Sequence, residues 1–203
     1  MTDIARRLRA SAAEALRRPL GADEEASLYK YLNLLVKWQK SQRLIGSDDP
    51  GWIIENVIAD SLLFTRVLSP GIRRLCDVGS GAGIPGIPLK VVMPSVAVTL
   101  LEPRQRRASF LAAAIRQLSL TDCRVVVSRV EDAPSEFAGS FDAIVMRCAG
   151  NPTEFIGSIS PWLTPRGIIV ASGPPAPYPV PKGEWVEVHR PRGPRRFWVY
   201  CAG

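Results

Sequence analysis

Apolar residues recur at every third or fourth position through much of the first 70 residues, which is the spacing of a helix with one apolar side. The clearest stripe consists of Leu28, Tyr31, Leu32, Leu34, Leu35 and Trp38. A short basic helix precedes it and ends at Pro19-Leu20-Gly21, and a third helix is predicted over residues 52–68, before Pro70-Gly71. We therefore predict that residues 1–70 form a helical extension that packs on the rest of the chain.

From residue 74 onward, short apolar runs alternate with amphipathic segments, a pattern typical of a parallel sheet covered by helices. The apolar runs are residues 75–78, 96–101, 123–127, 141–146 and 168–171, and the helical patterns cover residues 106–118 and 153–163. Two further runs, residues 185–188 and 197–200, predict an appended antiparallel hairpin. Residues 71–203 are thus predicted to form one α/β domain with a mostly parallel, Rossmann-like sheet.

The chain has 203 residues, of which 46% are hydrophobic, so it is long enough for one domain with a sizeable core. It carries 26 Lys and Arg against 19 Asp and Glu, a formal net charge of +7, and most of the basic residues are arginine. Arginine pairs with phosphate and stacks on bases, which favours a nucleic-acid partner. A codon bias that enriches Arg, Ala and Pro would give the same composition, so charge alone leaves both explanations open.

The four cysteines, Cys76, Cys123, Cys148 and Cys201, lack the paired spacing of a zinc site or of a secreted disulfide framework. We therefore expect no metal site and a reducing, cytoplasmic location. No stretch approaches the roughly 18 consecutive apolar residues of a membrane helix. The Arg-rich start also lacks the apolar stretch of a secretion signal, so no membrane partner is expected.

A glycine-rich segment, Asp77-Val78-Gly79-Ser80-Gly81-Ala82-Gly83, overlaps the end of the first predicted strand. Its alternate glycines let the backbone lie close against a ligand. S-adenosylmethionine binds at such a turn, and so does a dinucleotide, whose G-x-G-x-x-G pattern is matched by Gly81-Ala82-Gly83-Ile84-Pro85-Gly86. A tight strand-to-helix turn without any ligand is the third possibility.

The acid before the glycines separates the two cofactors. A dinucleotide would present a pyrophosphate, which Asp77 opposes, whereas S-adenosylmethionine brings an ammonium and a sulfonium, which Asp77 favours. Glu102 ends the next strand, where a carboxylate takes the ribose hydroxyls of an adenosine. We therefore predict a class I S-adenosylmethionine-dependent methyltransferase. The cofactor-binding residues predicted from this pattern are Asp77, Gly79, Ser80, Gly81, Gly83 and Glu102.

The fourth predicted strand is followed by Arg147 and Cys148, where this class of fold carries out its chemistry. The Asn-Pro-Pro-aromatic turn of exocyclic-amine methyltransferases is absent there, and Cys148 lacks the Pro-Cys context of cytosine-C5 enzymes. A ring nitrogen such as guanine N7 exposes a lone pair and needs alignment more than a general base. Arg147 is the candidate catalytic residue, donating to guanine O6 or to a phosphate. A structural ion pair with Glu131 or Asp142 is the alternative, and the single histidine, His189, is expected at the surface.

The long motif Asp77-Val78-Gly79-Ser80-Gly81-Ala82-Gly83-Ile84-Pro85-Gly86-Ile87-Pro88-Leu89 is specific. Further characteristic segments are Lys37-Trp38-Gln39-Lys40, Asp60-Ser61-Leu62, Ser128-Arg129-Val130-Glu131 and Arg147. On these residues the chain, over residues 28–172, resembles the bacterial small-subunit rRNA methyltransferases called RsmG, or glucose-inhibited division protein B (GidB).

The resemblance implies a metal-free enzyme that transfers a methyl group from S-adenosylmethionine to N7 of one guanine in 16S rRNA and leaves S-adenosylhomocysteine. It also implies that Gly79 and Ile84 line the cofactor pocket and that Val130 and Glu131 approach the adenine. Arg147 would lie between the cofactor and the acceptor. The expected partner is 16S rRNA or the small ribosomal subunit, and the expected state is a monomer.

Several acceptor-face positions differ from the residues usual in the family, among them residues 43–45, 56–57, 148–150 and 172–173. Two other functions therefore stay open: a diverged methyltransferase of the same fold acting on another RNA or a small molecule, and a non-catalytic RNA-binding protein. The basic first helix and the Arg-rich hairpin are candidate contacts to an RNA backbone. The hairpin arginines are Arg190, Arg192, Arg195 and Arg196, and its aromatic residues Phe197, Trp198 and Tyr200 are expected in the core.

Overall fold

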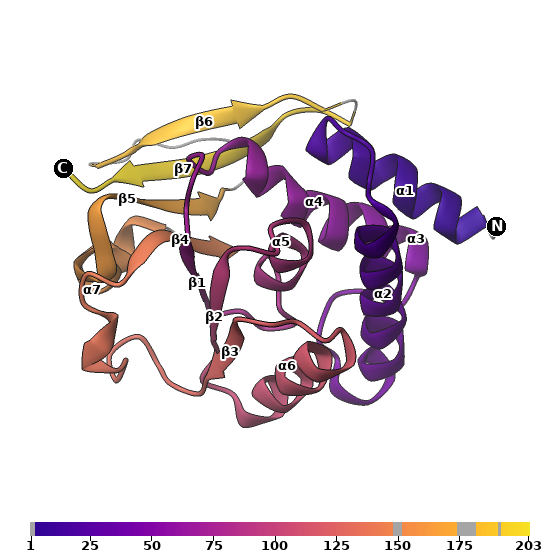
Figure 1. Ribbon diagram of the computed structural model, residues 1–203, viewed down its shortest axis with the longest axis horizontal. Coiled ribbons are helices and arrows are strands. Elements are labelled where there is room, and N and C mark those ends of the chain that lie inside the picture. Colours follow the sequence, from indigo (N-terminus) through magenta and orange to yellow (C-terminus); the bar gives the residue numbers. More distant parts are fainter. Residues whose placement is uncertain (1–2, 148–151, 174–181, 191) are drawn as a thin grey trace.

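A seven-stranded sheet runs through the computed structural model in the order β3-β2-β1-β4-β5-β7-β6 (Figure 1). The structure describes residues 3–147, 152–173, 182–190 and 192–203, without the side chains of residues 152 and 153. The strands are β1 (Arg74–Val78), β2 (Ala97–Leu101), β3 (Cys123–Val126), β4 (Phe141–Arg147), β5 (Leu163–Ser172), β6 (Glu184–Val188) and β7 (Arg195–Cys201). The first five strands pair in parallel, whereas β7 is antiparallel to β5 and to β6. The predicted parallel sheet and its C-terminal hairpin are confirmed.

Most of the helical residues cover one face of this sheet. The α-helices are α1 (Asp3–Leu16), α2 (Ala22–Gln42), α3 (Pro50–Ile53), α4 (Asp60–Leu62), α5 (Gly86–Val92), α6 (Gln105–Gln117) and α7 (Ile156–Ile159). The other helical turns are η1 (Ile54–Ala59), η2 (Leu63–Arg66), η3 (Ser135–Phe137), η4 (Pro152–Phe155) and η5 (Ser160–Trp162). Figure 1 shows α1, α2 and α4 side by side on one side of the sheet and α7 on the other.

The predicted N-terminal helices form, and they share a core with the sheet. Leu8 of α1, Tyr31 of α2 and Phe64 of η2 are fully buried in the same apolar cluster as Leu75 of β1. Edge-to-face contact between Trp38 and Phe110 joins α2 to α6, with ring centroids 5.5 Å apart. This core includes residues on both sides of residue 70. The predicted division into a helical extension (residues 1–70) and a methyltransferase domain (residues 71–203) therefore stays a prediction.

The third predicted helix is interrupted by a π-helical turn. Residues 50–66 stay helical throughout, but η1 within them is a π-helix, which ends at the C-cap residue Asp60. Single π-turns widen a helix locally and redirect the carbonyl groups and side chains around them. The side chain of Asp60 and the carbonyl of Asn56 are both used by the site described below.

The predicted helix over residues 153–163 is wrong as one element. It is replaced by the short pieces η4, α7 and η5, and Leu163 already belongs to β5. Gly157 weakens a helix here, and Pro161 lacks a backbone donor and clashes with the preceding turn. This face of the sheet is therefore thinly covered, by an apolar cluster that includes Phe137, Ile156 and Trp162.

The C-terminal hairpin is anchored by its aromatic residues. Phe197 and Trp198 are fully buried on opposite faces of the sheet, as expected for core residues, and Tyr200 is partly buried. Phe197 makes an edge-to-face contact with Phe64 of the helical layer, with ring centroids 4.8 Å apart. None of the described helices combines the length and apolar character needed to cross a membrane.

Candidate functional site

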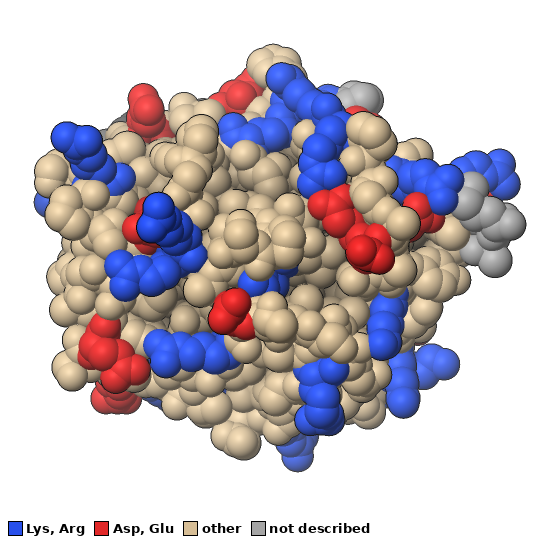
Figure 2. Space-filling model, in the orientation of Figure 1, with Lys and Arg blue, Asp and Glu red and all other residues tan. Residues whose placement is uncertain are grey.

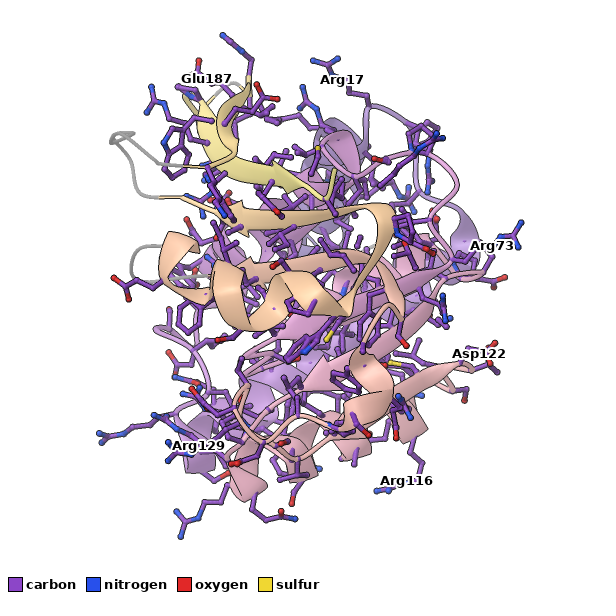
Figure 3. All side chains as sticks on the ribbon, turned by 90° about the vertical axis from the view of Figure 1, so that its left-hand side faces the viewer. Arg17, Arg73, Arg116, Asp122, Arg129 and Glu187 are labelled. Carbon is purple, nitrogen blue, oxygen red and sulfur yellow. The ribbon has the colours of Figure 1, made fainter. Side chains whose placement is uncertain are left out.

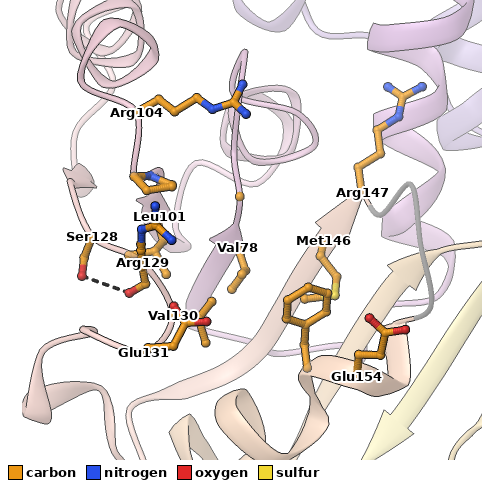
Figure 4. Close-up of a pocket in the computed structure, with 13 residues that line it drawn as sticks. Val78, Leu101, Arg104, Ser128, Arg129, Val130, Glu131, Met146, Arg147 and Glu154 are labelled. Carbon is orange, nitrogen blue, oxygen red and sulfur yellow. Dashed lines mark hydrogen bonds between the residues drawn. The ribbon is translucent and has the colours of Figure 1, made fainter.

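A cavity of about 630 Å³ opens at the carboxyl ends of the parallel strands (Figure 4). This volume lies within the range of roughly 300–1,000 Å³ that is usual for small-molecule sites. Its lining residues come from β1, β2, β4, the turn after β3 and the segment that leads into α7. They are Val78, Gly79, Leu101, Pro103, Arg104, Ser128, Arg129, Val130, Glu131, Met146, Arg147, Glu154 and Phe155. The sequence prediction had placed Gly79, Val130, Glu131 and Arg147 here, and the structure brings these four together.

The glycine-rich segment turns sharply between β1 and α5 and is bonded to the end of β2. The nitrogens of Gly79 and Ser80 both donate to the carbonyl oxygen of Leu101, at 2.9 and 3.0 Å. Gly79 has a φ of +71°, a conformation that favours glycine, and a Cβ added there would meet no atom within 4 Å. The backbone at Gly79 is therefore open to the cavity and free of side chain.

Asp77 lies beneath this loop rather than on the cavity wall. It is fully buried, and its Oδ2 accepts a hydrogen bond from the nitrogen of Gly86 at 2.9 Å. Burial raises the pKa of Asp77 to about 7; the Gly86 hydrogen bond opposes this shift and the nearby charge of Glu102 adds to it. Its Oδ1 has no hydrogen-bond partner among the described residues. Asp77 can thus act on a bound cation through its field, whereas its direct contact is with the loop.

Glu102 also holds the loop. Its Oε2 accepts from the nitrogen of Gly81 and its Oε1 from that of Arg104, at 2.8 and 2.9 Å. The residue is only 3% exposed and does not line the cavity. Each carboxylate oxygen has a second lone pair, so contact with a ribose hydroxyl stays a prediction.

The remaining predicted loop residues support the turn from behind. Ser80 Oγ donates to the carbonyl of Asp77, and the nitrogens of Gly83 and Ile84 donate to the carbonyl of Ser80. Ile84 packs against the core formed with the helical layer. Ser80, Gly81, Gly83 and Ile84 are not among the residues that line the cavity.

The helical extension contributes to this loop directly. The hydroxyl of Tyr31, in α2, donates to the carbonyl oxygen of Ala82 at 2.7 Å, and both residues are buried. Sequence reasoning treated Tyr31 only as part of an apolar stripe. A tyrosine in such a stripe signals a polar partner, because a buried hydroxyl is normally hydrogen-bonded.

Val130 and Glu131, next to Arg129, form the rim opposite Arg104 and Arg147. Figure 4 shows Arg104 and Arg147 on either side of Val78, with Glu131 and Glu154 at the other edge. The turn that carries Val130 is braced by Ser128, whose Oγ donates to the carbonyls of Arg129 and Asp132. The cavity therefore has an apolar floor and charges of both signs around its mouth.

Arg147 ends β4 and connects the cavity to the helical layer. Its Nη2 donates to the carbonyl of Asn56 at 2.7 Å and lies 3.6 Å from Asp60 Oδ2. Burial lowers the pKa of Arg147, the charge of Asp60 opposes this shift, and the charge of Arg195 adds to it. The alternative ion pairs predicted from the sequence, with Glu131 or Asp142, are wrong. Asp142 instead accepts from the nitrogens of Arg73 and Arg74 at the start of β1.

The sequence analysis did not identify several of the residues that line the cavity. Arg104, Met146, Glu154 and Phe155 all line the cavity, and Phe155 is 38% exposed. Ligands of open α/β sheets bind beyond the carboxyl ends of the strands, a rule that could have found Arg104 and Met146 from their places after β2 and in β4. Glu154 and Phe155 carried no such signal, because the predicted continuous helix gave them no special position.

Most arginines proposed as RNA contacts pair with acids within the chain. In the first helix and the loop after it, Arg9 pairs with Glu25 and Arg18 with Glu24. In the hairpin, Arg192 pairs with Glu55, Arg190 and Arg195 with Asp60, and Arg196 with Glu187. Figure 2 shows Lys and Arg dispersed over one face of the molecule with acidic residues between them. The net charge is therefore not gathered into a single basic field on this face.

The remaining candidate groups lie away from the cavity or outside the described residues. The side chain of His189 is 81% exposed, as predicted, and lies 3.5 Å from Glu187. Cys76 is buried, Cys123 is partly buried and Cys201 is exposed, whereas Cys148 falls outside the described residues. Across the part of the chain that the structure describes, no group of three or more His, Cys, Asp and Glu side chains is placed to hold a metal ion.

Comparison with known protein families gives a match over most of the chain. The model of the GidB family, described as rRNA small subunit methyltransferase G, matches residues 24–173. The chain belongs to the GidB family. Among curated GidB relatives, ribosomal RNA small subunit methyltransferase G of Sorangium cellulosum is 34% identical over 166 residues, which cover 79% of this chain and 69% of that protein. The protein of the same name from Pseudomonas aeruginosa strain LESB58 is 34% identical over 78% of this chain and 76% of its own length.

Solved structures agree on the fold. A putative methyltransferase, yhhF, from Escherichia coli superposes with a TM-score of 0.55 and 17% identity over 71% of this chain and 87% of that one. A SAM-dependent methyltransferase from Aquifex aeolicus gives a TM-score of 0.55 and 17% identity over 75% of this chain and 93% of that one. The predicted class I, Rossmann-like methyltransferase fold is confirmed for this member of the GidB family.

Proposed function

We propose that this protein transfers a methyl group from S-adenosylmethionine to N7 of one guanine in 16S rRNA, leaving S-adenosylhomocysteine. The observation that carries the proposal is a cavity in a GidB-family chain that is lined by Gly79, at the start of the glycine loop, and by Arg147. The relatives with which the chain aligns are named as small-subunit rRNA methyltransferases, and residues 24–173 include every residue that lines this cavity.

The residues around the cavity fit S-adenosylmethionine. Val78, Leu101 and Met146 offer apolar surface to an adenine ring and a thioether chain, while the open backbone at Gly79 admits close approach. Glu131 at the rim can accept hydrogen bonds from an amino group, as the resemblance implied. The buried, partly unsatisfied carboxylate of Asp77 favours a positively charged ligand above the loop.

S-adenosylmethionine supplies the electrophilic methyl group. Guanine N7 carries a lone pair and no proton, so the protein has to align the base and does not have to remove a proton from it. Arg147 is held by the Asn56 carbonyl and by Asp60 before any substrate arrives. Such preorganisation makes its remaining N–H groups effective donors to guanine O6 or to a neighbouring phosphate.

Methylation of small subunits from a strain that lacks the gene tests the proposal. Purified protein with labelled S-adenosylmethionine should modify the 30S subunit or stripped 16S rRNA, and mass spectrometry should find a single 7-methylguanosine. Arg147→Gln should lower the turnover by about 100-fold, as expected for loss of a preorganised donor. Arg116→Gln, on the exposed side of α6, should retain full turnover. Absence of 7-methylguanosine with the wild-type protein would contradict the proposal.

We further propose that the protein works as a monomer in the cytoplasm, where ribosomal subunits are made. Light scattering of the purified protein should give the mass of a single chain, and a concentration-dependent dimer would refute that part. Fractionation of cells should place the protein with the ribosomal supernatant, and recovery in the membrane pellet would argue against the location.

A further inference from the structure

One buried carboxylate faces three arginines beside the cavity. Asp60 is 4% exposed, and its oxygens lie 3.6 Å from Arg147 Nη2, 3.5 Å from Arg190 Nη1 and 3.0 Å from Arg195 Nε. The Arg195 Nε is too poorly aligned for a hydrogen bond, whereas its Nη2 donates to Asp60 Oδ2 at 3.3 Å. Three positive charges against one negative charge leave an excess of two positive charges in this cluster.

No other carboxylate offsets this excess. Across the described residues, Asp60 is the single acid within ion-pair distance of Arg147, Arg190 and Arg195. The segments outside the described residues contain no Asp or Glu in their sequence. The three arginine side chains are only 28%, 24% and 19% exposed, so water screens their repulsion incompletely. Such an arrangement favours an external anion.

Two buried polar groups beside the cluster also lack partners. Arg147 Nη1 and Ser172 Oγ are buried and make no hydrogen bond within the described part of the chain. Arg147 and Ser172 are aligned across β4 and β5, and strand alternation puts both on the face of Val145 and Val170, toward the helical layer. Buried polar groups are normally satisfied, so two unsatisfied neighbours indicate a missing partner.

The position of the cluster indicates what kind of partner is missing. Arg147 lines the cavity, but Arg190 and Arg195 do not, because they lie beyond β4 on the side of β5, β7 and the hairpin. No residue of β5, β6 or β7 is among those that line the cavity. A cofactor held by the ends of β1 and β2 would lie on one side of Arg147, and Arg190 and Arg195 lie on the other.

We propose that Arg147, Arg190, Arg195 and Ser172 form a phosphate-binding site that takes a backbone phosphate of the RNA substrate next to the target nucleotide. Asp60 is a positioning residue that holds the three guanidinium groups together. Arginine suits this role because its planar fork matches phosphate oxygens with two parallel hydrogen bonds. The inference rests on the proposed function. Arg190 and Arg195 lie outside residues 24–173, so the family match covers only part of the site.

Inorganic phosphate is the first probe, and it is independent of methyl transfer. Thermal unfolding is followed in phosphate and in chloride at equal ionic strength for the wild type, Arg195→Gln and Arg116→Gln. Phosphate should raise the Tm of the wild type and of Arg116→Gln, since a ligand of the folded state stabilises it. It should not raise the Tm of Arg195→Gln. Figure 3 shows why Arg116 is a matched control: it extends from the end of the molecule opposite Glu187, which marks the hairpin.

Binding of 16S rRNA and of S-adenosylmethionine is the second measurement. Arg195→Gln and Arg190→Gln should each weaken RNA binding about tenfold and reduce the slope of log K against log salt by about 0.7–0.9 for one lost phosphate contact. The affinity for S-adenosylmethionine should be unchanged. Arg195→Lys, which keeps the charge, should recover part of the RNA affinity and controls for misfolding.

Three results would overturn the phosphate site. If the Gln variants lose as much affinity for S-adenosylmethionine as for RNA, the cluster binds the carboxylate of the cofactor instead of an RNA phosphate. Unchanged RNA binding in both Gln variants would make the arginines purely structural, and so would an equal rise in Tm with phosphate in Arg195→Gln. If the wild type binds RNA with the predicted arginine dependence but transfers no methyl group, the proposed function fails and the phosphate site stands.

Discussion

The hydroxyl of Tyr31 donates to the carbonyl oxygen of Ala82 at 2.7 Å, across 51 residues of sequence. One residue belongs to the N-terminal helix α2 and the other to the glycine loop between β1 and α5. The helical layer therefore holds the loop in place by a buried polar contact as well as by packing. This contact makes the geometry of the glycine loop depend on α2.

Tyr31→Phe should lower both stability and cofactor affinity. The change leaves the buried Ala82 carbonyl without its donor, which costs roughly 1–3 kcal/mol for an unsatisfied group. Urea unfolding and calorimetry with S-adenosylmethionine measure the two effects. Tyr29→Phe is the matched control, because Tyr29 belongs to the same helix and is only partly buried. Equal behaviour of the two variants would show that the loop does not rely on Tyr31.

Gly86→Ala tests the close approach between Asp77 and the start of α5. A Cβ at Gly86 would lie 2.5 Å from Leu100 Cδ2 and 2.7 Å from Asp77 Oδ2, so the loop must shift. Overpacking of this kind costs roughly 1–3 kcal/mol in the free energy of unfolding. Gly157→Ala, where no atom lies within 4 Å, should leave stability unchanged or slightly higher. Unfolding in urea that is the same for Gly86→Ala and the wild type would refute the packing argument.

The raised pKa of Asp77 predicts a pH-dependent stability. Its pKa is about 7 in the folded protein and 3.8 in the absence of the fold, so the folded state binds more protons between these values. The corresponding stability is fully present below about pH 4 and is lost as the pH rises through 7. Compared with Asp77→Asn, which cannot ionise, the wild type should lose stability from pH 5 to pH 8. Parallel pH profiles from urea unfolding would contradict a shifted pKa.

The same ionisation should govern the affinity for the cofactor. A carboxylate favours the ammonium and sulfonium of S-adenosylmethionine, whereas a protonated Asp77 does not. Calorimetry should therefore find that the wild type binds more tightly as the pH rises through about 7, while Asp77→Asn stays flat. If the affinity of the wild type for S-adenosylmethionine does not change with pH, the charge of Asp77 does not contribute to cofactor binding, and its role is the hydrogen bond with Gly86.

Removal of the N-terminal arginine charges should leave the salt dependence of RNA binding unchanged. Arg9 and Arg18 already donate bidentate hydrogen bonds to Glu25 and Glu24, so their charges are matched within the chain. The double variant Arg9→Gln/Arg18→Gln is compared with Arg195→Gln by filter binding over a salt series. A smaller slope of log K against log salt in the double variant would show that the first helix does contact the RNA backbone.

The sequence by itself determined the parallel sheet, the hairpin, the glycine loop after β1 and the place of Arg147 at the end of β4, because these follow from local patterns. Strand and helix periodicities can be recognised from residues that are close together in the sequence, and so can a glycine run after a buried strand. Resemblance to a family then added Val130 and Glu131, which the structure places on the cavity wall.

Only the tertiary structure decided which charges face one another. The partners of Arg147 are Asn56 and Asp60, 91 and 87 positions away, and the π-turn η1 that precedes Asp60 has no signature in local periodicity. Likewise, most arginines of the predicted basic surface are paired with acids, and three of the chain's arginines gather around the single carboxylate of Asp60. Ion pairing depends on the distances between side chains from remote elements, and the packing of the helical layer on the sheet sets those distances.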